Sequence, residues 1–330
     1  MYNDVNMDTT QKIINFINNK GQVTAKEIVD EIGITRQALF RYHLNKLVEE
    51  EIIEKRGKPP KVFYSIKENQ EPKQSFSISK EYADKIEDNY LIITSSGQEK
   101  RGVQGFSYWC DKNNLPIEKT AKEYIDTLKK YDKYKRNGFI DGTEKFINSF
   151  KEVFIDKVFY IDFYSIERFG KTKLGQILLY AKNSQDKRLI KELVLEIKPK
   201  IEKIIKEFNI DGVGFIPPTV KREIQLMKEI QKQLKLKTRI IEISKIKTDI
   251  IVPQKTISKI GDRIENAQKT MSVEENSVFS NILLIDDAVG SGATFNEIAR
   301  KIRKKGICEN KIIGLAITGS FKGFDVISEV

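Results

Sequence analysis

A stretch near the carboxyl end of the chain constrains the fold more than any other segment. Residues 281–297 read NILLIDDAVGSGATFNE: an apolar run, two adjacent carboxylates, a loop of small residues and a helical pattern. The run 282–285 predicts a strand covered on both faces, because such a strand is continuously apolar. A strand that leads through a short loop into a helix is the unit of parallel α/β sheets. The sequence therefore predicts an α/β domain.

The end of this predicted strand has the chemistry of a sugar-phosphate site. Carboxylates follow the apolar run, and open α/β sheets bind ligands at the carboxyl ends of their strands. Glycines in the loop let the backbone approach an anion, and amides at a helix start can donate to a phosphate. A structural strand–turn–helix with an acidic turn is the alternative interpretation. The residues placed in this site are Asp286, Asp287, Ala288, Val289, Gly290, Ser291, Gly292, Ala293 and Thr294.

The thirteen-residue pattern 282–294 resembles the motif with which type I phosphoribosyltransferases bind 5-phosphoribosyl-1-pyrophosphate (PRPP). The resemblance implies that Asp286 and Asp287 hold the ribose hydroxyls and that the following loop holds the 5-phosphate. It also implies the fold of that family, a parallel sheet with helices on both faces, and Mg²⁺ that comes with PRPP without direct protein ligands. Gly290 stands where the family more often has Thr, Ser or Ala, and Ala288 replaces a larger aliphatic residue.

Two upstream segments resemble the ComF-like members of that family. A predicted strand at 212–216 precedes a proline turn and basic residues, and the resemblance implies that these basic residues contact pyrophosphate. Solvated basic residues at a helix start are the alternative. Residues 251–267 resemble the mobile hood before the PRPP strand, and Ser258 and Asn266 match its pattern. The expected pyrophosphate and hood residues are Pro218, Thr219, Lys221, Arg222, Gln254, Lys255 and Arg263. The amino-terminal zinc-binding cysteines often found in ComF-like proteins are missing.

Residues 10–67 have the pattern of a small helical domain with a hairpin. Helices are predicted from residue 10 to about 18, from a capping box at 24–27 to Gly33, and from Thr35 onward. Strands at 52–56 and 61–66 would flank a Gly-Lys-Pro-Pro turn. This order resembles the winged helix-turn-helix domain of bacterial regulators. The resemblance implies that the third helix enters the major groove of DNA and that the wing contacts the backbone.

The residues expected to contact DNA are polar or basic. They are Thr35, Arg36, Gln37, Arg41, Tyr42 and Lys46 on the third helix, and Arg56, Lys58 and Lys61 on the wing. A role in protein contacts or dimerisation is the alternative, because residues 1–70 hold 11 Lys or Arg against 10 Asp or Glu. DNA-binding domains usually have a basic footprint. The acidic run 49–51 is expected behind the reading face, which leaves the basic residues clustered.

Length and charge bound the possible organisation. A chain of 330 residues predicts two or three domains. We assign 1–70 to the DNA-binding domain, 71–155 to a linker and accessory region, and 156–330 to the phosphoribosyltransferase-like domain. The net charge of +11 suits an anionic partner, either nucleic acid or a polyphosphate. The single histidine, His43, argues against histidine metal sites and Ser-His-Asp triads.

Other features predict a cytoplasmic protein that does not enter a membrane. No apolar run approaches the roughly 18 residues that a membrane span needs, and the start of the chain is unlike a signal peptide. Two cysteines cannot build a disulfide framework. Winged-helix regulators commonly dimerise, so a homodimer is one candidate state, although the sequence does not determine it.

Two functions follow from these patterns. One is a transcriptional regulator that senses PRPP or a nucleotide. The other is a Mg²⁺-dependent phosphoribosyltransferase that moves ribose 5-phosphate from PRPP to a nitrogen acceptor. The purine repressor of Gram-positive bacteria is similar in joining a winged helix to a phosphoribosyltransferase-like domain, and this resemblance favours the regulator.

Overall fold

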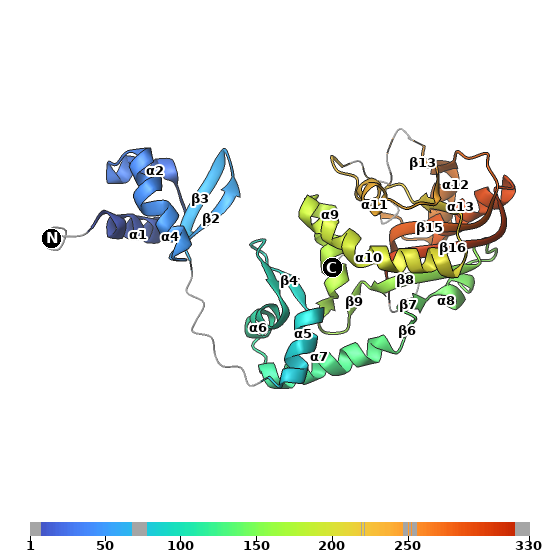
Figure 1. Ribbon diagram of the computed structural model, residues 1–330, viewed down its shortest axis with the longest axis horizontal. Coiled ribbons are helices and arrows are strands. Elements are labelled where there is room, and N and C mark those ends of the chain that lie inside the picture. The colour runs from blue at the N-terminus through green and yellow to red at the C-terminus, as the bar shows by residue number, and fades with distance from the viewer. Residues whose placement is uncertain are drawn as a thin grey trace. The chain divides into compact units, whose positions relative to one another are not determined.

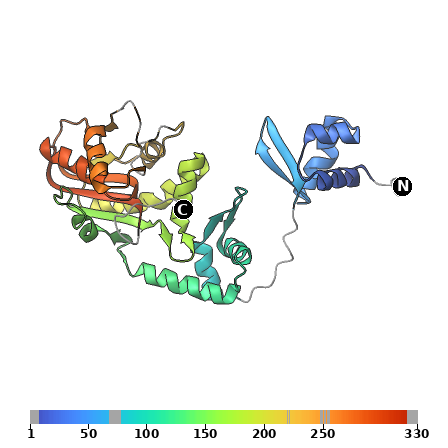
Figure 2. The same cartoon turned by 180° about the vertical axis from the view of Figure 1, so that it is seen from behind.

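The chain folds into two compact units, Met1–Phe76 and Ser77–Val330, each with its own hydrophobic core (Figures 1 and 2). The computed structural model describes residues 8–67, 78–218, 220, 222–246, 250, 252 and 256–320. Within these ranges, no helix is both long and apolar enough to cross a membrane.

The amino-terminal unit consists of helices and a small antiparallel sheet. Its elements are α1 (Thr9–Lys20), β1 (Val23–Thr24), α2 (Ala25–Ile32), α3 (Arg36–Ala38), the π-helical stretch η1 (Leu39–Leu44), α4 (Asn45–Glu49), β2 (Ile53–Lys58) and β3 (Lys61–Ile66). Because α3, η1 and α4 follow one another without a break, they form the expected third helix. The strands are ordered β1-β3-β2, and β2 with β3 makes the wing.

Local signals in the sequence set the helix ends of this unit. Thr24 Oγ1 accepts from the Glu27 amide at 3.3 Å while Glu27 accepts from the Thr24 amide at 2.6 Å, so the predicted capping box is confirmed. Gly33, with φ +71°, ends α2, and Thr35 caps α3 by accepting from the Ala38 amide at 3.2 Å. The core of this unit includes Ile13, Ile17, Ile28, Leu39, Leu44 and Leu47, all of which are buried.

The first helix differs from its prediction. α1 begins at Thr9 and continues to Lys20, with Asp8 at its amino end. Thr10, where the sequence predicts the helix to begin, therefore lies inside it. Its Oγ1 is 3.0 Å from Nδ1 of the partly buried His43, a contact that links the first helix to the third.

The larger unit is built around a seven-stranded sheet of order β12-β11-β15-β16-β8-β7-β6. Its elements are α5 (Lys80–Asn89), β4 (Leu91–Ile93), β5 (Glu99–Arg101), α6 (Gly102–Lys112), α7 (Ile117–Asp132), β6 (Lys135–Arg136), β7 (Phe139–Asp141), α8 (Thr143–Ile147), β8 (Lys157–Phe163), β9 (Ser165–Ile166), β10 (Gly170–Lys171), α9 (Lys173–Ser184), α10 (Lys187–Glu207), β11 (Gly212–Phe215), α11 (Leu226–Leu234), β12 (Arg239–Ile241), β13 (Ile243–Lys245), α12 (Ile260–Thr270), β14 (Met271–Val273), β15 (Phe279–Val289), α13 (Ala293–Lys304) and β16 (Cys308–Gly319). The strands from β12 to β8 are parallel, and β7 and β6 extend the sheet with antiparallel pairs.

Helices cover both faces of this sheet, as the apolar run of β15 predicts. Successive side chains of a strand point to opposite faces. Leu283 and Ile285 accordingly join the core beneath α9, α10 and α11, whereas Ile282 and Leu284 join the core that includes α13 (Figure 1). The prediction of an α/β domain is therefore confirmed.

The larger unit begins well before residue 156, where the sequence places the start of this domain. Residues 78–155 contribute β6 and β7 to the sheet, and α6 and α7 supply Phe106 and Tyr124 to one of its two cores. These pairings join distant parts of the chain, so periodicity within 71–155 does not indicate them.

The strand order reverses at one point in the sheet. From β11 the chain crosses to β12 on one side, whereas from β15 it crosses to β16 on the other side. The neighbours β11 and β15 therefore flank the switch point, where open α/β sheets bind their ligands.

Candidate functional site

The predicted acidic pair lies at the carboxyl end of β15, beside the switch point. β15 runs farther than predicted, to Val289, because its pairing with β16 continues through Ala288↔Thr318. Its pairing with β11 ends earlier, at Ile285↔Phe215. From Asp286 onward β15 therefore pairs with β16 along one edge and, within the described residues, has no strand partner along the other.

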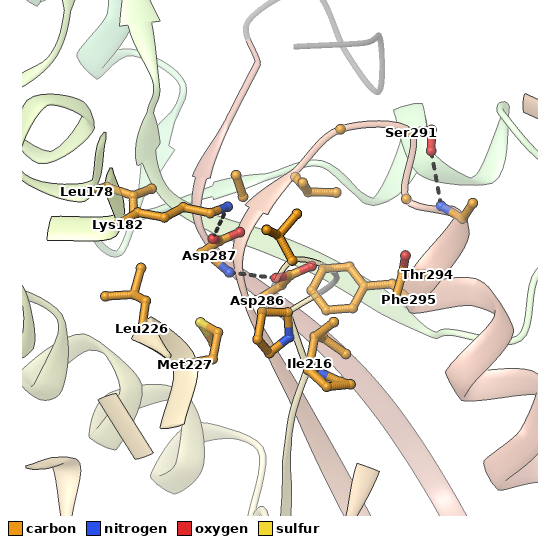
Figure 3. Close-up of a pocket in the computed structure, with 18 of the residues that line it drawn as sticks. Leu178, Lys182, Ile216, Leu226, Met227, Asp286, Asp287, Ser291, Thr294 and Phe295 are labelled. Carbon is orange, nitrogen blue, oxygen red and sulfur yellow. Dashed lines mark hydrogen bonds and ion pairs between the residues drawn. The ribbon is translucent and has the colours of Figure 1, made fainter. Parts of the chain in front are cut away.

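A cavity of about 280 Å³ lies at this unpaired edge of β15 (Figure 3). All nine residues predicted for PRPP line it, and Pro218, Arg222 and Arg263 of the pyrophosphate and hood set line it as well. The predicted Thr219, Lys221, Gln254 and Lys255 lie outside the described residues. Segments far apart in the sequence thus meet around one space.

The two carboxylates of the pair have different surroundings. Asp287 forms an ion pair with Lys182 of α9, and the carboxylate of Asp287 raises the pKa of that lysine. Asp286 lies on the other face of β15 and accepts from the Asp287 amide at 2.7 Å. Burial and the neighbouring charge of Asp287 raise the pKa of Asp286 well above its ordinary value. Asp287 thus has a lysine partner, whereas Asp286 is a buried carboxylate beside a second negative charge.

The loop after β15 leads into the amino end of α13 and has the backbone features predicted for an anion site. Gly292 has φ +76° and directly precedes α13, whose first amides lack carbonyl partners within the helix. Ala293 and Thr294, at the start of this helix, line the cavity. A Cβ on Gly292 would lie 2.5 Å from Cε2 of Phe146. Asn296 fixes the start of the helix by donating to Glu152 O at 2.8 Å and accepting from the Phe154 amide at 2.9 Å. The hydroxyls of Ser291 and Thr294 belong to the same turn (Figure 3).

Arg222 and Arg263, the two described basic residues expected to bind pyrophosphate, have protein partners. Arg222 donates to the carbonyl of Lys182 at 3.0 Å and to Oδ1 of Asn183 at 3.1 Å, at the carboxyl end of α9. A cation is favoured there by the helix dipole. Arg263 of α12 is only 5% exposed and donates through Nε to Ile257 O at 2.6 Å, and burial lowers its pKa.

Sequence reasoning missed the wall of the cavity opposite the loop. Lys182 and Leu178 come from α9, and Leu226 and Met227 begin α11. The amphipathic pattern of these helices indicates only which side is buried. It does not distinguish side chains that line a cavity from those that fill the core.

The residues predicted to contact DNA are all exposed on the amino-terminal unit. The Arg41 guanidinium lies 5.4 Å from the centre of the Tyr42 ring. Lys46 is 3.8 Å from Glu50, and Arg56 pairs with Glu54, so these two cations also have acidic neighbours. Lys58 and Lys61 face each other at the tip of the wing.

Comparison with known proteins identifies the first unit. Residues 8–54 match the family model described as winged helix-turn-helix DNA-binding. None of the curated proteins compared with the chain is significantly similar to it. The chain thus joins an amino-terminal winged helix-turn-helix domain to a larger α/β domain with a seven-stranded, mostly parallel sheet.

Proposed function

We propose that this protein is a DNA-binding regulator whose α/β domain binds PRPP or a phosphoribosyl nucleotide. One observation carries the proposal: Asp286, Asp287 and the loop 290–294 line the same cavity at the switch point of the sheet. Carboxylates accept hydrogen bonds from sugar hydroxyls, and amides at a helix start donate to phosphate. The 5-phosphate would lie on the loop and the ribose hydroxyls on the acidic pair.

The donor chemistry of the cavity also suits Mg²⁺ that comes with the ligand. Two carboxylates without histidine or cysteine offer the oxygen ligands that Mg²⁺ prefers. Among the described residues, no group of three or more His, Cys, Asp or Glu side chains could hold a metal alone. We therefore expect Mg²⁺ to be held by the diphosphate of PRPP and by water, without a direct protein ligand.

The winged helix supports regulation as the biological role. Its exposed third helix and wing present the residue types that contact phosphates and base edges. Binding of a phosphoribosyl ligand in one domain and of DNA in the other would let the ligand concentration control transcription.

A second candidate is catalysis of phosphoribosyl transfer. The wall formed by Leu178, Leu226 and Met227 would suit a planar base beside the ribose. Incubating the full chain with PRPP, Mg²⁺ and nucleobases while following pyrophosphate release separates the two functions. Calorimetric binding without release supports the regulator, and release with any base supports the transferase. If the chain binds neither PRPP nor phosphoribosyl nucleotides, the proposed site is rejected.

We expect Arg41→Ala to weaken DNA binding of the full chain about 5- to 50-fold, because it removes an exposed cation from the reading helix. If Arg41 contacts a phosphate, the slope of log affinity against log salt also becomes shallower by about one. Fluorescence anisotropy with genomic DNA fragments measures both quantities. Lys12→Ala, on α1, is the matched control, and an equal loss in both variants would contradict the assignment.

A further inference from the structure

Lys182 places a cation in the cavity, beside the acidic pair. The ammonium of Lys182 pairs with Asp287 Oδ2, and its side chain is 38% exposed while that of Asp287 is 15% exposed. The Asp287 carboxylate is thus largely buried, whereas part of the Lys182 side chain is exposed to solvent. An ammonium has three donors, so a single bond to Asp287 leaves donors for a ligand.

Lys182 and the anion loop lie at opposite ends of the site. In Figure 3, Asp286 and Asp287 lie between Lys182 on one side and Ser291 and Thr294 on the other. In a ribose 5-phosphate group, the 2- and 3-hydroxyls lie between C1 and C5. A sugar whose 5-phosphate is on the loop and whose hydroxyls are on the acidic pair therefore has its C1 directed toward Lys182.

We infer that Lys182 recognises an anionic group on C1 and so selects a phosphoribosyl diphosphate over ribose 5-phosphate. The inference rests on the proposed sugar-phosphate site and names the residue that determines its specificity. The four-carbon stem of lysine lets the ammonium move between a carboxylate and a nearby phosphate oxygen. Lys182 would thus orient Asp287 before the ligand binds and contact the diphosphate afterwards.

The segment after β11 supports this arrangement by holding the end of α9. Arg222 donates to the carbonyl of Lys182, and the Ile224 amide donates to Oε1 of Gln185 at 2.6 Å. These bonds fix the last turn of the helix that carries Lys182. Lys182, the cation that pairs with Asp287, therefore comes from α9. The end of this helix is held by residues 222–224, which follow β11 in the segment where the sequence predicts the pyrophosphate contacts.

Calorimetry on the full chain with two ligands tests the inference. PRPP with Mg²⁺ carries the C1 diphosphate, and ribose 5-phosphate with Mg²⁺ lacks it. For Lys182→Met we expect PRPP affinity to fall about 10-fold or more, as for the loss of a charge-assisted hydrogen bond, and ribose 5-phosphate affinity to fall less than about threefold. Lys182→Arg should keep most of the preference for PRPP.

Controls separate this inference from the proposed site. Lys187→Met removes the next lysine of the chain, which is exposed at the start of α10 and does not line the cavity, and both affinities should stay unchanged. Equal losses for the two ligands in Lys182→Met, or no loss, would overturn the specificity role alone. Failure of the unmodified chain to bind either ligand would reject the site and the inference together. If Lys182→Met does not fold, Lys182→Gln provides the same comparison.

Discussion

Asp287→Asn is expected to weaken PRPP binding by about 100-fold, because a charged acceptor of a sugar hydroxyl becomes a neutral amide and Lys182 loses its ionic partner. Asparagine has nearly the same shape, so the strand and the cavity should remain. Titration calorimetry with PRPP and Mg²⁺ measures the loss. DNA binding in the absence of ligand should not change, because Asp287 belongs to the other compact unit.

A second carboxylate outside the cavity provides the control for this experiment. Asp126 is exposed on α7 and does not line the cavity, and the replacement Asp126→Asn removes the same charge. Its PRPP affinity should stay within about twofold of the unmodified chain, since exposed charges at a distance are screened by salt. A folded Asp287→Asn protein that binds PRPP normally would contradict the assignment of the acidic pair.

Gly292→Ala is expected to lower the free energy of unfolding of the α/β unit by about 2–4 kcal/mol. Two effects combine: φ +76° is strained for alanine, and the new Cβ would lie 2.5 Å from the buried ring of Phe146. Relief of this contact would shift the loop that precedes α13, so we also expect PRPP affinity to fall. Urea denaturation and calorimetry measure the two losses.

Another glycine separates the two causes. Gly306, after the carboxyl end of α13, has φ +67°, but a Cβ there would meet nothing within 4 Å. Gly306→Ala should therefore cost only the backbone strain, about 1–2 kcal/mol, and leave PRPP binding intact. If the two variants lose equal stability, the contact with Phe146 has no energetic role.

Features that depend on neighbouring residues were well indicated by the sequence. The capping box of Thr24 and Glu27, the end of α2 at Gly33 and the buried run of β15 involve side chains within a few positions of one another. Their physical causes are local hydrogen bonds, backbone freedom and continuous apolar character. The same reasoning placed Asp286 and Asp287 together with the loop that follows them.

Features that depend on distant partners were not indicated. β15 reaches Val289 because β16 pairs with it there, and nothing within 281–297 encodes that pairing. Lys182 lies about a hundred positions before Asp287, in a helix whose pattern assigns it to a partly exposed side. Arg222 lines the cavity, and its predicted contact with a ligand stays a prediction, but the bond from its guanidinium to the end of α9 is set by how two segments meet in space.

Helix α9 connects the cavity to α5 at the other end of the helix. Its last turn carries Lys182, and at its first turn Lys173 donates to the carbonyl of Asp88 in α5, at 3.0 Å. α5 is the first helix of the larger unit, and α9 is an unbroken rod of about 18 Å. The two ends of a rod cannot move independently. A displacement of Lys182 by a ligand would therefore act as a lever on the part of the α/β unit closest in sequence to the DNA-binding domain.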